Sequence, residues 1–331
     1  MIGNDSRPAA MVADGRAPTM TAVGQHRLGD PDVLELVTVP VPRPGPGEVL
    51  VRVAATSLNP TDWVHRRAEG FLGAIPAGAP PRVLGWDVSG TVECVGLGVT
   101  LHDVGDDVFG MLPYPGGYGA AAEYVVAPAR ALVPKPRDVP HTHAAAVSLA
   151  GVTAVQALID TAHLRPGDRV LVHAGAGGVG HLATQLAAGH GAHVVATASR
   201  GHHDFVSECG ACQVIDYTTT PFEDEAHDID VVIDCVGGDY PDRSARTLRD
   251  GRGTIVSLAL NRTERLPARP GLRHKLMLVE ADHYSMCTLE ELLADGVLTP
   301  HLAATFPLDR AADGHRLGET GHVAGKIVLT T

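Results

Sequence analysis

A run of glycines between an apolar segment and a helical segment constrains this chain more than any other feature. Arg169–Ala174 has the pattern of a buried strand, Val179–Ala188 has the pattern of a helix, and Gly175–Gly180 joins them. Glycines stand at the first, third and sixth positions of this turn, as in the G-x-G-x-x-G fingerprint. The flanking strand and helix are the context that makes such a match informative.

Each glycine of this turn has an expected physical role. We expect Gly175 to permit a tight turn, Gly177 to let the backbone approach a diphosphate, and Gly180 to let the helix pack closely on the strand. Amides at the start of the helix, and the positive end of its dipole, then face the phosphates. The sequence therefore predicts a dinucleotide site that includes Gly175, Ala176, Gly177, Gly178, Val179 and Gly180.

The end of the next strand distinguishes between the two nicotinamide cofactors. An NAD site normally has an acidic residue about 20 residues after the glycine turn, where it binds the ribose hydroxyls. Here the strand ends with Thr197, Ser199 and Arg200 and has no acid. Ser199 can donate a hydrogen bond and Arg200 can pair with a 2′-phosphate, which an acid would repel. We therefore expect NADPH, and the alternative is that Arg200 is a solvated loop residue.

The hydrophobic pattern divides the chain into parts. Residues 20–140 show short strands separated by turns, which favours a barrel-like β domain. Residues 141–298 alternate strands with helices, which predicts a doubly wound parallel sheet in a Rossmann domain. Residues 299–331 return to strand and turn and are expected to rejoin the first domain, and residues 1–19 are expected to form a disordered tail. The predicted fold class is therefore α/β.

Charge and composition argue against several classes of protein. The net charge of −12 opposes binding to a nucleic-acid backbone. No apolar run reaches the roughly 18 residues of a membrane span. Residues 1–18 lack the apolar core of a secretory signal, so a cytoplasmic location is expected. The five cysteines, an odd number, argue against a disulfide framework.

Short motifs on both sides of the glycine turn carry a family resemblance. They are Leu-Asn-Pro-Thr-Asp-Trp at 58–63, Gly-Trp-Asp-Val-Ser-Gly at 85–90, Val-Gly-Asp-Asp-Val at 104–108 and Ala-Gly-Val-Thr-Ala at 150–154. With these motifs the chain resembles the medium-chain dehydrogenase/reductase superfamily, in its quinone oxidoreductase-like branch, from residue 20 to residue 331.

The resemblance implies a GroES-like β domain, a Rossmann domain, an active cleft between them and a possible homodimer. It further implies that Thr153 lies near the cofactor and that Tyr217 contacts the 2′-phosphate. The backbone flanking the nicotinamide would come from Val236, Gly237, Leu258 and Ala259.

The resemblance also bears on metal binding. Alcohol dehydrogenases of this superfamily hold a catalytic zinc with a Cys, a Gly-His-Glu motif and a later Cys. This chain has Asn59 near the first ligand and Trp86-Asp87 in place of His-Glu, and no cysteine cluster follows Val108. Because zinc needs three or four protein ligands, we expect this chain to work without zinc.

The acceptor follows from the expected absence of zinc. Zinc polarises a carbonyl oxygen, so without it an electron-poor, conjugated acceptor is easier to reduce. Quinones and α,β-unsaturated carbonyl compounds fit this requirement. The basic segment Asn261–Lys275 is either a solvated loop or a landing patch for an acidic carrier protein that holds the substrate.

Four residues are candidates for the catalytic side of the cleft. Asn59 either hydrogen-bonds the substrate carbonyl or the nicotinamide ribose, or simply forms a turn before the following proline. Trp63, together with Trp86, either walls an apolar pocket or packs in the core. Tyr114 and Tyr118 either donate a proton and line the entrance or are exposed without a role.

Two functions from different classes remain open. The first is a zinc-independent NADPH-dependent reductase of quinones or enones, including enoyl reduction in a biosynthetic pathway. The second is a non-catalytic NADPH-binding sensor or structural protein. The glycine turn supports both, and turnover with an acceptor distinguishes them.

Overall fold

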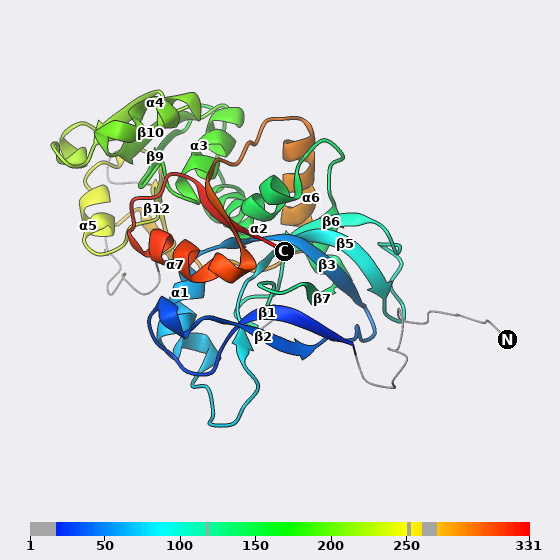
Figure 1. Cartoon of the computed structure of the whole chain (residues 1–331). Coiled ribbons are helices and arrows are strands. Elements are labelled where there is room, and N and C mark those ends of the chain that lie inside the picture. Colours follow the sequence, from blue (N-terminus) through cyan, green and yellow to red (C-terminus); the bar gives the residue numbers. More distant parts are fainter. Residues whose placement is uncertain (1–17, 117–118, 250–252, 260–269) are drawn as a thin grey trace.

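The computed structural model describes residues 18–116, 119–249, 253–259 and 270–331 (Figure 1). Most of the expected N-terminal tail lies outside the described residues, and the first strand, β1, already begins at Thr19. Mixed α/β architecture with a parallel Rossmann sheet and a GroES-like β domain confirms the predicted fold class.

The β domain is built on a seven-stranded sheet and a smaller three-stranded sheet. The larger sheet has the order β15-β16-β3-β5-β6-β8, and β7 pairs with β3. The smaller sheet has the order β2-β1-β4. Their bounds are β1 Thr19–Gln25, β2 Glu35–Pro40, β3 Glu48–Leu58, β4 Arg82–Val83, β5 Asp87–Val95, β6 Asp107–Met111, β7 Tyr124–Pro128, β8 Leu132–Pro134, β15 Leu302–Pro307 and β16 Lys326–Thr330.

The C-terminal segment contributes two strands to the β domain. β16 pairs antiparallel with β3 and parallel with β15, so the end of the chain lies beside a strand from near its start (Figure 1). Between them lies the helix α7, Ala311–Glu319, which packs near α1, Pro60–Arg67. The prediction of only strand and turn here was wrong, because Ala311, Gly314 and His315 form a helically spaced buried face.

The Rossmann domain has a six-stranded parallel sheet with the order β11-β10-β9-β12-β13-β14. The strand order reverses between β9 and β12, and ligands of such sheets bind at the carboxyl ends near this point. The bounds are β9 Arg169–Val172, β10 His193–Ala198, β11 Gln213–Asp216, β12 Val231–Asp234, β13 Gly253–Ser257 and β14 Leu272–Leu276, with helices α3 Gly180–Gly189, α4 His203–Glu208, α5 Tyr240–Ser244 and α6 His283–Ala294.

The edge strand β14 corrects part of the loop predicted at Asn261–Lys275. Arg273 and Lys275 belong to this strand. The strand was missed because basic residues interrupt the apolar side chains that would mark it in the sequence. Residues 261–269 of that segment lie outside the described part of the chain.

The helix α2, His141–Val155, joins the two domains. Most of its apolar side chains belong to one core cluster that also contains residues of β3, β5 and β9, and Ala145 and Ala146 pack in a smaller cluster with Val328 of β16. Together with the following helical turn it spans His141–Thr161, which is long and apolar enough to cross a membrane by length and composition. Because 83% of that window is buried inside the protein, it serves as a core helix.

Gly325, just before β16, ties the C-terminal segment to the glycine-rich turn. Its N–H donates to the carbonyl oxygen of Ala176 at 2.8 Å. Its φ of +74° suits glycine, and a Cβ there would lie 2.2 Å from the carbonyl oxygen of His301.

We predict that Gly325→Ala lowers the free energy of unfolding by several kcal/mol, because it adds a backbone clash to the cost of a left-handed alanine, about 1 kcal/mol. Gly321→Ala is the matched control, since Gly321 has a similar φ of +72° and open space around its Cβ position. Thermal denaturation of both variants measures the difference, and equal losses would contradict the prediction.

Candidate active site

The glycine-rich turn lies at the carboxyl end of β9 and leads into α3. α3 begins at Gly180, and a Cβ there would lie 2.0 Å from the carbonyl oxygen of Ala174. Helix and strand therefore approach as closely as expected for the last glycine of the fingerprint.

Gly175 lies inside the tight turn, which the N–H of Gly177 closes by donating to the carbonyl oxygen of Ala174 at 2.8 Å. Ala174, at the start of this turn, has the left-handed φ of +53°. Gly175 is also required for packing, because its Cβ would lie 2.9 Å from the Cβ of Ala196 in β10.

The turn fits a diphosphate. Gly177 and Gly178 leave the backbone bare just before the N-terminus of α3, which is the arrangement that binds phosphate through amides. A Cβ at Gly178 would already be 3.2 Å from the Cδ of Lys326, so a side chain there has little room. Ala176 and Val179 complete the turn, and the former accepts the hydrogen bond from Gly325.

The residues predicted at the end of β10 differ in their surroundings, because Thr197 is buried and Ser199 and Arg200 are closer to the surface. Thr197 is buried, and its Oγ1 accepts a hydrogen bond from the N–H of Ala174 at 3.2 Å. Its side chain thus holds the start of the glycine turn. Ser199 and Arg200 follow at the surface, where Ser199 Oγ lies 3.2 Å from His202 Nδ1 and Arg200 is exposed.

An acid that the sequence analysis did not consider lies near Arg200. Asp216 ends the neighbouring strand β11, and hydrogen bonds from Thr218 hold its pKa below the usual range, helped by the charges of His203 and Arg200. Tyr217 follows it and is 43% exposed. The surface around Arg200 therefore combines an anion with two groups able to be cations.

The carboxyl ends of β12 and β13 are held by Asp234. Its Oδ1 accepts hydrogen bonds from the N–H groups of Val236 and Gly237, both at 2.9 Å. Its Oδ2 accepts from the Ser257 hydroxyl at 2.8 Å, and its carbonyl oxygen accepts from the N–H of Leu258. The predicted nicotinamide-flanking backbone, which continues to Ala259, is thus shaped by a buried carboxylate.

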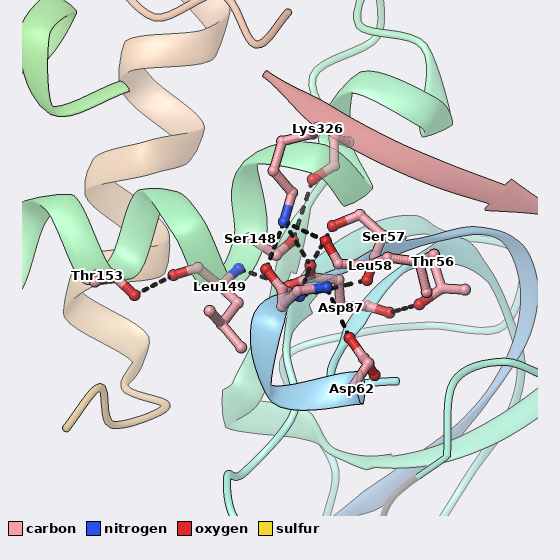
Figure 2. A network of polar contacts seen from close by, with 11 residues as sticks. Thr56, Ser57, Leu58, Asp62, Asp87, Ser148, Leu149, Thr153 and Lys326 are labelled. Carbon is pink, nitrogen blue, oxygen red and sulfur yellow. Dashed lines mark hydrogen bonds and ion pairs between the residues drawn. The ribbon is translucent and has the colours of Figure 1, made fainter. Parts of the chain in front are cut away.

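Figure 2 shows a polar network around Asp87 and Lys326. Asn59 is buried and belongs to this network through its hydrogen bonds. Its Nδ2 donates to Asp87 Oδ2 at 2.8 Å and to the carbonyl oxygen of Ser57. Its Oδ1 accepts a hydrogen bond from Lys326 Nζ, which also donates to the carbonyl oxygen of Leu58 at 3.0 Å. Because its amide is engaged on both sides, Asn59 holds other groups in place and does not present a free donor to a ligand.

The same network extends into α2 through Asp87. Asp87 Oδ1 accepts from the N–H of Leu149 in α2 at 2.6 Å. The carbonyl oxygen of Leu149 accepts from the Thr153 hydroxyl at 2.7 Å, as Figure 2 shows. Thr153 therefore lies at the far end of a continuous polar path that begins at Lys326.

Charges in this network are buried and unequal in number. Lys326 Nζ lies 3.8 Å from Asp87 Oδ2, and Asp62 is the second carboxyl nearby. Burial raises the pKa of Asp87 and lowers that of Lys326, while their attraction opposes both effects. Burial raises the pKa of Asp62 to about 7, so this carboxyl takes up its proton as the pH falls through neutrality and the network then keeps one carboxylate for Lys326.

Asp62 also has a structural role. Its Oδ2 accepts from the N–H of Asn59 at 2.7 Å and forms the capping box of α1. Asp62 is therefore a helix-capping residue, whereas Asp87 forms the ion pair with Lys326.

The predicted aromatic residues do not gather as one wall. Trp63 packs against α7, where a Cβ at Gly318 would lie 2.7 Å from its ring. Tyr114 instead lies edge-on to Trp86, with ring centroids 5.2 Å apart. Tyr118 lies outside the described residues.

Sequence reasoning missed His65, which completes the aromatic cluster. His65 is buried, with its ring 5.5 Å from that of Trp86, and its Nε2 lies 3.2 Å from the Tyr114 hydroxyl. Phe71 closes the outer side, 6.2 Å from Tyr114, and is 63% exposed. The signal lay in the His-Arg-Arg end of α1, where helical spacing places His65 on the face of Asp62.

Lys326 was also missed as a site residue, although a lysine at the start of an apolar strand was visible in the sequence. Among the described residues, no group of three or more His, Cys, Asp or Glu side chains could hold a metal ion.

Two family models match the chain. The alcohol dehydrogenase GroES-like domain matches residues 45–137, and a zinc-binding dehydrogenase model matches residues 209–329. These ranges cover much of the β domain and most of the Rossmann and C-terminal segments.

Curated relatives and solved structures resemble the chain over nearly its whole length. A 2-haloacrylate reductase of Burkholderia sp is 35% identical over 92% of this chain and 97% of that protein. A chloroplastic NADPH-dependent alkenal/one oxidoreductase of Arabidopsis thaliana is 34% identical over 96% of this chain and 82% of that protein. A quinone oxidoreductase structure from Coxiella burnetii is 36% identical, has a TM-score of 0.87, and the match covers 95% of this chain and 100% of that chain.

We predict that Asp62→Asn makes stability less dependent on pH. The pKa of this carboxyl rises from 3.8 to about 7 on folding, so between these two pH values the folded state binds a proton that the unfolded state does not. Its contribution to the free energy of unfolding therefore falls as the pH rises through this interval. The asparagine keeps the capping acceptor and removes the titration. The free energy of unfolding, variant minus wild type, should therefore rise from about pH 4 to about pH 8, at roughly 1.4 kcal/mol per pKa unit at most. Parallel denaturation profiles for the two proteins would refute this.

Proposed function

Because this chain belongs to the medium-chain dehydrogenase/reductase superfamily, in its quinone oxidoreductase-like branch, we propose that it is a zinc-independent reductase that uses NADPH to reduce a quinone or an α,β-unsaturated carbonyl compound. That it is an oxidoreductase with a nicotinamide cofactor follows from its relatives. The choice of NADPH, the acceptor and the independence from zinc are the proposal.

The observation that carries the cofactor proposal is the glycine-rich turn at the start of α3, with Arg200 beyond the end of the next strand. When bound, NADPH supplies the hydride. The amides at the start of α3 hold the diphosphate, and the Arg200 guanidinium pairs with the 2′-phosphate. Asp216 lies near enough to Arg200 for their opposite charges to attract each other.

The acceptor proposal rests on the β-domain side of the site. Asn59 and Trp86 stand where the zinc-dependent relatives have ligands, so no protein-bound metal polarises the substrate there. Relatives named for alkenals, enones and quinones act on electron-poor conjugated compounds, in which the acceptor itself supports the negative charge. The cluster of Trp86, Tyr114 and Phe71 offers flat apolar surfaces that suit such compounds.

Different residues of the chain have separate roles in the proposed reaction. The Asn59–Asp87–Lys326 network holds the two sides of the cleft in register, and Asp234 shapes the backbone beside the nicotinamide. Tyr114 holds the proton that the reduced substrate takes up. A cytoplasmic location and a homodimer remain proposals beside this one.

Turnover with a panel of acceptors tests the proposal. Purified protein with NADPH should consume the cofactor when a quinone, an alkenal or an enone is added, and metal analysis should find no stoichiometric zinc. NADPH binding without consumption by any of these acceptors would favour a non-catalytic binding protein. Zinc at one ion per chain would contradict zinc independence.

We predict that Arg200→Ala raises the KM for NADPH by about tenfold or more, because one charge-assisted hydrogen bond contributes about 1.5–3 kcal/mol. The KM for NADH should stay unchanged, since NADH has no 2′-phosphate. Arg165→Ala is the control, because Arg165 is exposed just before β9, at the amino end of this strand and opposite to the end that carries the glycine-rich turn. An unchanged KM for NADPH in Arg200→Ala would remove Arg200 from the site.

A further inference from the structure

The buried histidine His65 is hydrogen-bonded to Tyr114, a half-buried tyrosine of the aromatic cluster. His65 is 1% exposed and sits in α1, and its Nε2 lies 3.2 Å from the Tyr114 hydroxyl oxygen. Tyr114 is half-buried, in the loop that follows β6. The hydrogen bond therefore joins a rigid helix to a loop side chain.

The rings around this pair hold the histidine in a single orientation. The His65 ring lies 5.5 Å from Trp86 and 6.2 Å from Phe71, and 5.9 Å from the ring of Tyr114. Gly70 closes the remaining side, since a Cβ there would lie 2.7 Å from His65 Nδ1. A side chain so confined presents its Nε2 at one fixed point.

This cluster adjoins the polar network of the candidate site. Trp86 directly precedes Asp87, and α1, which carries His65, begins right after Asn59. Asp62 of the same helix is close enough to Tyr114 to act on its hydroxyl electrostatically. The hydroxyl thus lies beside the groups that join the two domains.

We propose that His65 is a positioning residue that holds the Tyr114 hydroxyl as the proton donor of the reduction. The inference rests on the proposed function. A hydride delivered to the β-carbon moves the π electrons of the double bond onto the carbonyl oxygen. The Tyr114 hydroxyl gives its proton to the α-carbon, and solvent then reprotonates the phenolate.

His65 stays neutral throughout this cycle. Burial lowers the pKa of His65 and raises that of Tyr114, so imidazole and phenol are the forms present near neutral pH. In the tautomer that this role requires, His65 Nε2–H donates to the Tyr114 oxygen, so the hydrogen bond fixes the hydroxyl and leaves its proton for the substrate.

Two substitutions of His65 separate the hydrogen bond from the bulk of the ring. The amide of glutamine reaches the place of Nε2, whereas the shorter amide of asparagine reaches only the place of Nδ1. With an enone, His65→Asn should lower kcat by about tenfold or more and leave the KM for NADPH unchanged, because misplacing a proton donor costs part of its contribution. His65→Gln should keep most of kcat.

Tyr114→Phe completes the test. Its loss of kcat should equal or exceed that of His65→Asn, and adding His65→Asn to Tyr114→Phe should cause no further loss. His65→Phe keeps an aromatic ring and removes the hydrogen bond, so it should behave as His65→Asn and serves if the asparagine variant does not fold.

A readout that does not need turnover accompanies the kinetics. The nitrogen-15 chemical shift of His65 Nε2 should change in Tyr114→Phe. An unchanged shift, or equal kcat values for His65→Gln, His65→Asn and wild type, would overturn the inference and leave the proposed function intact. A wild-type protein that turns over neither quinones nor enones would overturn the proposed function, and this inference with it.

Discussion

The buried ion pair between Lys326 and Asp87 is the constraint on which the arrangement of the site depends. Removing one partner of such a pair costs about 3–5 kcal/mol, because the other charge is left buried and alone, although the intact pair contributes little net stability. The pair instead restricts Lys326 and its neighbours to one arrangement. Lys326 can satisfy its charge only where the carbonyl oxygen of Leu58 and the amide of Asn59 also meet it.

That arrangement connects parts of the chain that are far apart in sequence. Lys326 and Asn59 are separated by 267 positions, and β16 places them together by pairing with β3. The residue before Lys326 is hydrogen-bonded to the glycine-rich turn, and Asp87 is hydrogen-bonded to α2. The register between the β domain and the dinucleotide turn is thus set by a few buried polar contacts.

The family resemblance implies that Trp86 stands where zinc-dependent relatives have a histidine ligand, and in the structure Trp86 packs against Tyr114 and His65. A metal in such a site withdraws charge from a carbonyl oxygen, and a cluster of Trp86, Tyr114 and His65 provides instead a flat surface and one hydroxyl. In the proposed reductase no metal stabilises the negative charge that hydride transfer creates, so the substrate itself must stabilise this charge. Conjugated acceptors do so, and they need a proton at carbon afterwards.

Local pattern was sufficient for the central strands and the glycine-rich turn of the Rossmann domain. Buried strands such as β9 and β10 have continuous apolar runs, and the glycine turn between β9 and α3 has a spacing set by backbone contacts within about ten residues. The expected close approach at Gly180 follows from those local contacts alone. By contrast, α7 and β14 were missed, because their buried faces form only when distant elements cover them.

The sequence by itself determined the fold class, the dinucleotide turn and the lack of an acid at the end of β10, since each depends on residue type at short spacing. Only the tertiary structure decided which polar groups are already used. It engaged the amide of Asn59, turned Thr197 toward the glycine turn, packed Trp63 against α7 and brought His65 to Tyr114. The physical reason is that a hydrogen bond or ring contact depends on partners in three dimensions, and those partners come from segments that sequence spacing does not relate.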